Sequence, residues 1–209
     1  NAELHAGGVR TNYILKEGGN TFHGVMFGAY APGGLQSDNL TDALRARGLP
    51  TPNKIKANWD VNPGFGGPIV RDRLWFYTSV RAWSAQQYVA GMFYNKSLVP
   101  WRYEADTTQP ALNIETNGNE SLRLTWQAAA KHKITGQYQY GQQDRPFYGY
   151  SLGQTLASPE AAYASKSIPS YLGQVGWNSP MTNKILLEAG AAVANKNFFT
   201  FLQPVAGNN

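Results

Sequence analysis

The chain has 209 residues, of which 15% are charged, with a formal net charge of +5 and no cysteine. This length suffices for one domain with a sizeable core, but the charged fraction lies well below the roughly 25% of ordinary soluble domains. The missing cysteine excludes disulfides, thiolate metal sites and a cysteine nucleophile. No run of eighteen apolar residues occurs, which excludes a transmembrane helix. The Lys and Arg residues are scattered, which argues against a nucleic-acid partner.

Alternation of apolar and polar residues with a period of two dominates the chain and predicts strands. Helical spacing is limited to two short stretches. The first precedes Gly48, with Asp38 or Asn39 as the N-cap, and the second follows Ser158, with Pro159 at the first helical position. The predicted strands are residues 9–16, 22–30, 59–70, 74–84, 121–127, 134–142, 171–177 and 185–193.

The predicted connections alternate strictly between short and long. Residues 70–73, 129–132 and 179–183 form tight turns, whereas residues 31–57, 90–119 and 145–170 form long loops. Long loops without regular structure are uncommon in compact soluble domains. Short periplasmic turns and long extracellular loops are typical of outer-membrane β-barrels.

Three tryptophans, Trp75, Trp126 and Trp177, each lie within a few residues of a predicted tight turn. We expect them to lie at a membrane–water boundary, where tryptophan combines an apolar ring with a hydrated N–H. Trp126 and Trp177 fall on the apolar faces of their strands, whereas Trp75 shares a face with Arg81. The alternative interpretation is the aromatic core of a soluble β-sandwich.

These patterns predict an all-β fold, an antiparallel transmembrane β-barrel fragment of about seven strands. Bacterial single-chain barrels have even strand numbers from about eight upward. Seven strands would leave two open edges, which are aggregation hazards. The chain also opens on Asn1 rather than Met. We therefore expect a piece of a longer protein.

The opening residues 7–24 (GGVRTNYILKEGGNTFHG) resemble the end of the plug of a TonB-dependent outer-membrane receptor running into its first barrel strand. Residues 65–76 (FGGPIVRDRLWF) resemble the first short-turn hairpin of the Oar-like branch of that family. Residues 36–40 (QSDNL) and 44–49 (LRARGL) fit the first long loop of the same branch. Arg10, Thr11 and Tyr13 depart from the Ile-Asn-Ile plug strand of commoner members, which favours the Oar-like branch.

The resemblance implies a plug end at residues 1–20 and the first part of an outer-membrane barrel at residues 21–209. It implies energy-coupled uptake of a scarce solute (a siderophore, oligosaccharide or peptide) across the outer membrane. The partners that it implies are outer-membrane lipid and the TonB–ExbB–ExbD complex, which binds a part of the plug that this chain lacks. The lumen of the 22-stranded transporters is plugged.

No catalytic constellation is found in the sequence, so we expect neither an enzyme nor a cofactor. His5, His23 and His132 make no metal-ligand spacing with one another or with a carboxylate pair, and no metal site is expected. No nucleophile elbow or phosphate-binding loop occurs. Glu104 and Asp106 are interpreted as solvated loop residues rather than an acid–base pair.

Aromatic residues beside a cation in the second and third long loops predict a solute site, because aromatic faces stack on sugars, peptides and chelates. The alternative is packing of the loops against each other. The predicted solute-site residues are Trp101, Tyr103, Arg145, Tyr148 and Tyr150. The residues predicted to face the lumen and pair with plug groups are Arg81, Arg123, Gln137 and Gln139.

Two alternatives to a transporter stay open, namely a secreted β-sandwich that binds carbohydrate and an outer-membrane barrel with a structural or adhesion role. The predicted lipid and lumen faces should respond differently to a buried charge. Leu124→Arg should be costly on the lipid face near mid-membrane. Thr125→Arg, on the lumen face, should cost much less.

Overall fold

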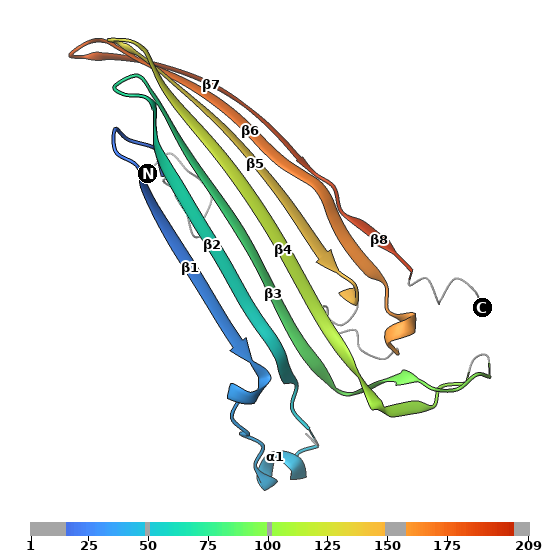
Figure 1. Ribbon diagram of the computed structural model, residues 1–209. Helices are drawn as coiled ribbons and strands as arrows, with labels where there is room; N and C mark the ends of the chain where they lie inside the picture. Colours follow the sequence, from blue (N-terminus) through green and yellow to red (C-terminus); the bar gives the residue numbers. More distant parts are fainter. Residues whose placement is uncertain (1–15, 49–50, 100–101, 149–157, 203–209) are drawn as a thin grey trace.

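The computed structural model describes residues 16–48, 51–99, 102–148 and 158–202. In these residues, eight antiparallel strands form one curved sheet, in which β1 to β7 lie side by side in chain order (Figure 1). The expected all-β fold is confirmed. The strands are β1 (His23–Pro32), β2 (Lys54–Val70), β3 (Leu74–Asn95), β4 (Ala105–Ala129), β5 (His132–Arg145), β6 (Ala164–Thr182), β7 (Ile185–Lys196) and β8 (Phe199–Phe201). The last of these, β8, pairs with β6 beyond the end of β7.

The three short turns, residues 71–73, 130–131 and 183–184, lie at one end of the sheet and the long connections lie at the other (Figure 1). The connection from β1 to β2 contains the 3-10 turn η1 (Gly33–Leu35) and helix α1 (Asp42–Ala46). Another 3-10 turn, η2 (Pro159–Ala161), precedes β6. In the described part of the chain, no helix combines the length and the hydropathy that a bilayer span requires.

Helix α1 confirms the first predicted helix, but the cap is neither Asp38 nor Asn39. Thr41 is the N-cap, and its hydroxyl accepts a hydrogen bond from the backbone N–H of Leu44. The backbone N–H of Gly48 bonds to the carbonyl of Arg45, and the positive φ of Gly48, 93°, suits a glycine at this end.

The predicted loop over residues 90–119 is wrong, because β3 continues to Asn95 and β4 begins at Ala105. Residues 105–120 contain Pro110 and several Asn and Thr residues but no continuous apolar face. Their pairing with β3 supplies the backbone hydrogen bonds. A strand segment needs no apolar face where it does not cover a core or meet lipid. Strand β6 likewise begins earlier than predicted, at Ala164 rather than Tyr171.

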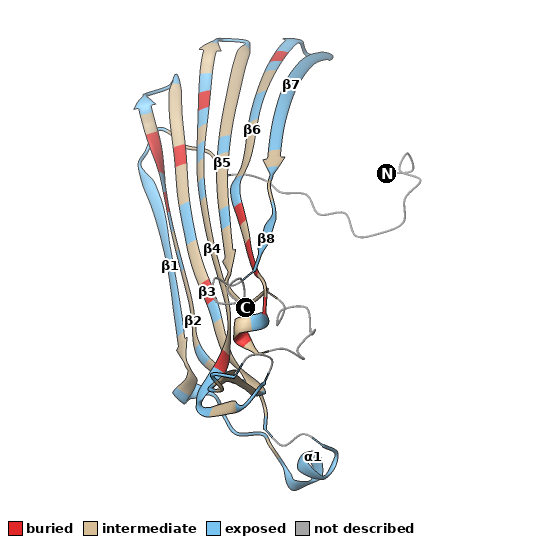
Figure 2. Cartoon of the chain, turned by 90° about the vertical axis from the view of Figure 1, so that its right-hand side faces the viewer, coloured by how far each residue is buried: buried red, intermediate tan, exposed pale blue. Residues whose placement is uncertain are grey.

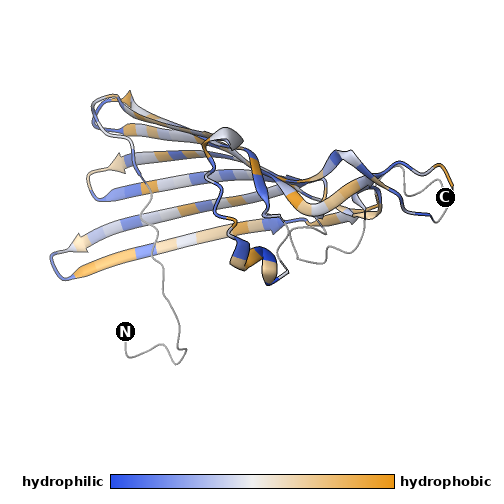
Figure 3. Ribbon diagram, turned by 90° about the horizontal axis from the view of Figure 1, so that it is seen from below, coloured by the Kyte–Doolittle hydropathy of each residue, from blue (hydrophilic) through white to orange (hydrophobic). Residues whose placement is uncertain are grey.

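Hydrophilic and hydrophobic residues follow each other along the strands (Figure 3). Because successive side chains of a strand point to opposite faces, the sheet has two chemically different faces. One cross-strand row holds Tyr77, Arg123, Gln137 and Gln174, and we name the side of the sheet that carries it the polar face. The neighbouring row holds Phe76, Leu124, Gly136 and Val175, and its side is the apolar face.

Little of the apolar surface is buried within the described residues (Figure 2). The buried hydrophobic residues are Tyr77, Ala111, Ala162 and Ala164. Leu122, Leu124, Tyr138, Val175 and Val193 of the apolar face are all exposed. The edge strands β1 and β7 are exposed along nearly their whole length. Within the described residues there is one sheet rather than two packed ones, so the β-sandwich alternative is wrong.

Candidate functional site

The segment before the first strand, residues 16–22, lies against the polar face, and we call it the junction segment. The Glu17 carboxylate accepts hydrogen bonds from the Arg123 guanidinium of β4 (2.5 Å) and the Lys133 ammonium of β5 (3.0 Å). Burial alone would raise the pKa of Glu17. The hydrogen bonds from Lys133 and Arg123 and their positive charges outweigh burial, so the pKa is lowered below its ordinary value.

A second contact of the junction segment is made by Asn20 at the turn between β2 and β3. The Asn20 side-chain oxygen accepts from the Trp75 indole N–H (2.7 Å) and from the backbone N–H of Asp72 (2.9 Å). Its amide nitrogen donates to the Asp72 carboxylate (2.5 Å). Between the two contacts, Gly18 passes so close to β3 that a Cβ there would lie 2.2 Å from the carbonyl oxygen of Phe76.

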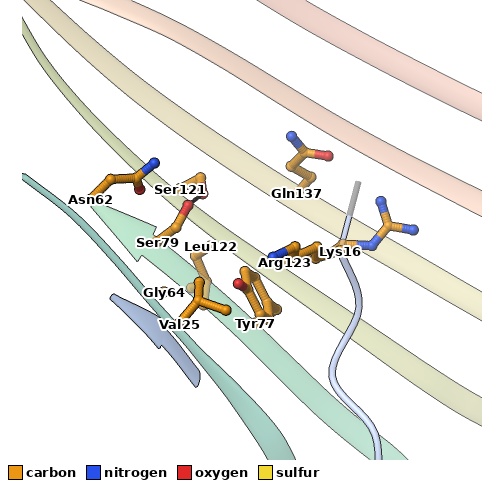
Figure 4. Close-up of a pocket in the computed structure, with 10 residues that line it drawn as sticks. All are labelled: Lys16, Val25, Asn62, Gly64, Tyr77, Ser79, Ser121, Leu122, Arg123 and Gln137. Carbon is orange, nitrogen blue, oxygen red and sulfur yellow. Dashed lines mark hydrogen bonds between the residues drawn. The ribbon is translucent and has the colours of Figure 1, made fainter. Parts of the chain in front are cut away.

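A depression of about 250 Å³ opens beside the junction segment, lined by Lys16, Tyr77, Ser79, Ser121, Arg123 and Gln137 among others (Figure 4). Figure 4 shows Lys16, at the start of the junction segment, beside Arg123 of the sheet. The lining combines hydroxyl, amide and cationic groups with the apolar side chains of Val25 and Leu122.

The four residues predicted to face the lumen, Arg81, Arg123, Gln137 and Gln139, all lie on the polar face. Arg123 pairs with Glu17 of the junction segment. Arg81 instead holds both carboxylate oxygens of Asp60 on the adjacent strand, with a shortest distance of 2.6 Å. Gln139 donates to the Asn119 side chain (3.1 Å).

The predicted solute-site residues are partly brought together at the long-loop end. Arg145 makes an ion pair with Glu115 (2.6 Å), and its guanidinium lies 5.4 Å from the ring centroid of Tyr148. Tyr148 packs edge-on against the rings of Tyr163 and Phe198. Tyr103 lies on a different connection. Its hydroxyl donates to the carbonyl of Phe93. Trp101 and Tyr150 lie outside the described residues.

The end of β3, which the sequence placed in the second long loop, contacts the third long connection. Tyr94 meets Phe147 edge-on, and the Glu160 carboxylate accepts from the backbone N–H of Asn95 (2.9 Å). Ala111 and Ala162 form a small apolar cluster here, onto which Phe147 packs. Tyr94 and Phe147 therefore pack against each other at this end of the sheet, although Tyr94 belongs to β3 and not to a loop.

The sequence of one curated protein is similar to this chain. It is the TonB-dependent transporter Oar of Myxococcus xanthus, 28% identical over 113 residues, which is 54% of this chain. The expected resemblance to Oar-like TonB-dependent receptors is confirmed. The match spans 9% of the length of that transporter. No profile of a known family matches the chain, and no solved structure matches it.

The tryptophans expected at a receptor's membrane boundary differ in their contacts. Trp126 and Trp177 lie in one cross-strand row of the apolar face, on either side of Ile134. Trp177 stacks on His132 and donates its indole N–H to the ring (3.2 Å). Trp75 lies on the opposite, polar face, as the strand alternation indicated, and its indole holds Asn20. For Trp75 the junction contact replaces the lipid contact that was expected.

Sequence reasoning did not identify Glu17, Lys133, Asn20 or Asp72 as site residues. Glu17 and Lys133 are 116 positions apart, and Asn20 and Asp72 are 52 apart. A signal was present in the plug-like opening, where Glu17 is the acidic residue closest to the first strand. In the described residues, no group of three or more carboxylate or histidine side chains is placed to hold a metal ion.

Proposed function

We propose that this chain is the junction of plug and barrel in an Oar-like TonB-dependent receptor that takes up a scarce solute across the outer membrane. Residues 1–20 would end the plug, and residues 21–209 would form the first strands of the barrel. The observation that carries the proposal is the two-faced sheet. Its apolar face is exposed, and its polar face holds the junction segment through Glu17 and Asn20.

The two faces match the two environments of a barrel wall. Leu122, Leu124 and Val175 would meet lipid, and Trp126 and Trp177 would mark the membrane boundary near the short turns. Arg81, Arg123, Gln137 and Gln139 would face a plugged lumen. The exposed edges of β1 and β7 would pair with the remaining strands, because every backbone donor in lipid needs a partner.

The role proposed for the whole receptor is energy-coupled transport, and it involves no catalysis. The energy would come from the TonB–ExbB–ExbD complex, and the solute would be a siderophore, an oligosaccharide or a peptide. The mouth residues Arg145 and Tyr148 offer a cation and an aromatic face, which suit such solutes. An outer-membrane barrel with a structural or adhesion role is the second candidate, since the contact between Tyr94 at the end of β3 and Phe147 of the third long connection joins them into one surface.

The test uses the full-length protein in its outer membrane. We expect it to sediment with the outer membrane and to resist extraction by urea at high pH. Uptake of labelled ferric siderophores, oligosaccharides and peptides is then compared in cells with and without TonB. At least one solute should enter only when TonB is present. A protein recovered in soluble form would refute the membrane assignment, and TonB-independent phenotypes would favour the adhesion role.

A further inference from the structure

The junction segment is fastened to the sheet at two separate places within four residues, and both lie ahead of the first strand. We propose that Glu17 and Asn20 form a two-point anchor that holds this end of the plug on the wall while the chain before it is pulled away. The role of this anchor rests on the proposed function. Its evidence is the set of contacts made by residues 17–22.

The first point of the anchor spans two strands. Glu17 is held by Arg123 on β4 and by Lys133 on β5, at 2.5 and 3.0 Å. A load that reaches Glu17 is therefore divided between neighbouring strands, which are themselves paired over many residues. Charge-assisted hydrogen bonds are the stronger kind, which suits a point that bears load.

The second point is at the turn between β2 and β3. The Asn20 amide makes three hydrogen bonds, two to Asp72 and one to the Trp75 indole. Asp72 has a positive φ of 62°. Its backbone N–H donates to the Asn20 side-chain oxygen, and its carboxylate accepts from the Asn20 amide nitrogen. The two points attach the junction segment to different parts of the sheet.

The contacts downstream continue the attachment into the first strand. The Phe22 ring stacks on the Phe65 ring of β2, with centroids 5.7 Å apart, and β1 begins at His23 in register with Gly66. A pull on the chain before Lys16 must break the contacts of Glu17 and then those of Asn20 before any load reaches β1. The anchor would thus confine plug displacement to the residues that precede it and protect the edge pairing of β1 with β2.

The experiment is single-molecule force spectroscopy on the full-length receptor in a lipid bilayer, pulled from its N-terminus. In the unmodified receptor, the force peaks that precede unfolding of the barrel should show extension stopping first at Glu17 and then at Asn20. Glu17→Gln should remove the first stop, so that extension first stops at Asn20. With Asn20→Ala added, the stop should reach β1, which lengthens the free chain by residues 17–22, about 20 Å at ~3.4 Å per residue.

Asp60→Asn is the matched control, because it weakens an ion pair to Arg81 on the same face without touching the junction segment. It should leave every stop unchanged. A stop within β1 in the unmodified receptor, or an unchanged stop in the double variant, would overturn the anchor. The force is applied externally, so the result does not depend on TonB. Absence of TonB-dependent uptake would instead refute the proposed function.

Discussion

Replacing Leu122 by arginine tests the assignment of the apolar face to lipid. Leu122 is 43% exposed on that face and lies four residues along β4 from Trp126. Tilted strands rise about 2.5 Å per residue along the membrane normal, so Leu122 lies about 10 Å from the Trp126 level. The apolar band is about 25 Å tall, which places Leu122 near the midplane. Arginine there should lower the free energy of unfolding by about 2–4 kcal/mol.

The assay is denaturant unfolding of the full-length receptor refolded into lipid vesicles. Gln139→Arg is the control, because Gln139 pairs with Ser121 at nearly the same height but on the polar face. It should cost much less than Leu122→Arg. Leu124→Arg should cost an intermediate amount, because Leu124 is closer to the Trp126 level. Equal costs for Leu122→Arg and Gln139→Arg would refute the assignment of the two faces.

Three further predictions concern the junction segment, whose docking is measured by hydrogen exchange in the full-length receptor. Gly18→Ala should weaken docking by about 1–3 kcal/mol, because the added Cβ clashes with Phe76. Gly19→Ala is the control and should leave docking unchanged, because nothing lies within 4 Å of a Cβ there. Equal protection of the junction segment in the two variants would contradict this prediction. Asn20→Ala should lower the protection of residues 16–22 by about 1–2 kcal/mol, and unchanged protection would count against the Asn20 contact. The pKa of Glu17 is lowered in the docked state. Its contribution to the stability of docking is therefore complete above the ordinary pKa of 4.5 and is lost as the pH falls through the lowered pKa. Glu17→Gln should abolish this pH dependence of docking. If the dependence persists in that variant, another titrating group causes it.

Much of the sheet was predictable from the local alternation of apolar and polar residues. Strands Ile185–Lys196 and His132–Arg145 lie close to their predicted ranges, and the three tight turns fall where they were expected. The period of two is a local property, since each residue alternates with its own neighbours. It assigned Arg123 and Gln137 to one face and Leu124 to the other before any pairing was known.

The pattern failed where a strand has no apolar face. Residues 105–120 look like a loop, yet they pair with β3 because backbone pairing requires a partner strand and no particular side chain. The burial of Thr125 argues against the expectation that Thr125→Arg would be mild. Thr125 is only 2% exposed, so an arginine has no room there. Local alternation gives the direction of a side chain but not what covers it.

The sequence by itself determined the fold class, the end of the sheet that carries the short turns, and the chemical character of each face. Only the tertiary structure joined Glu17 to Arg123 and Lys133, and Asn20 to Trp75. These contacts link positions between 55 and 116 residues apart. They depend on the register of several strand pairs at once, which no local periodicity encodes. The anchor is therefore a property of the assembled sheet.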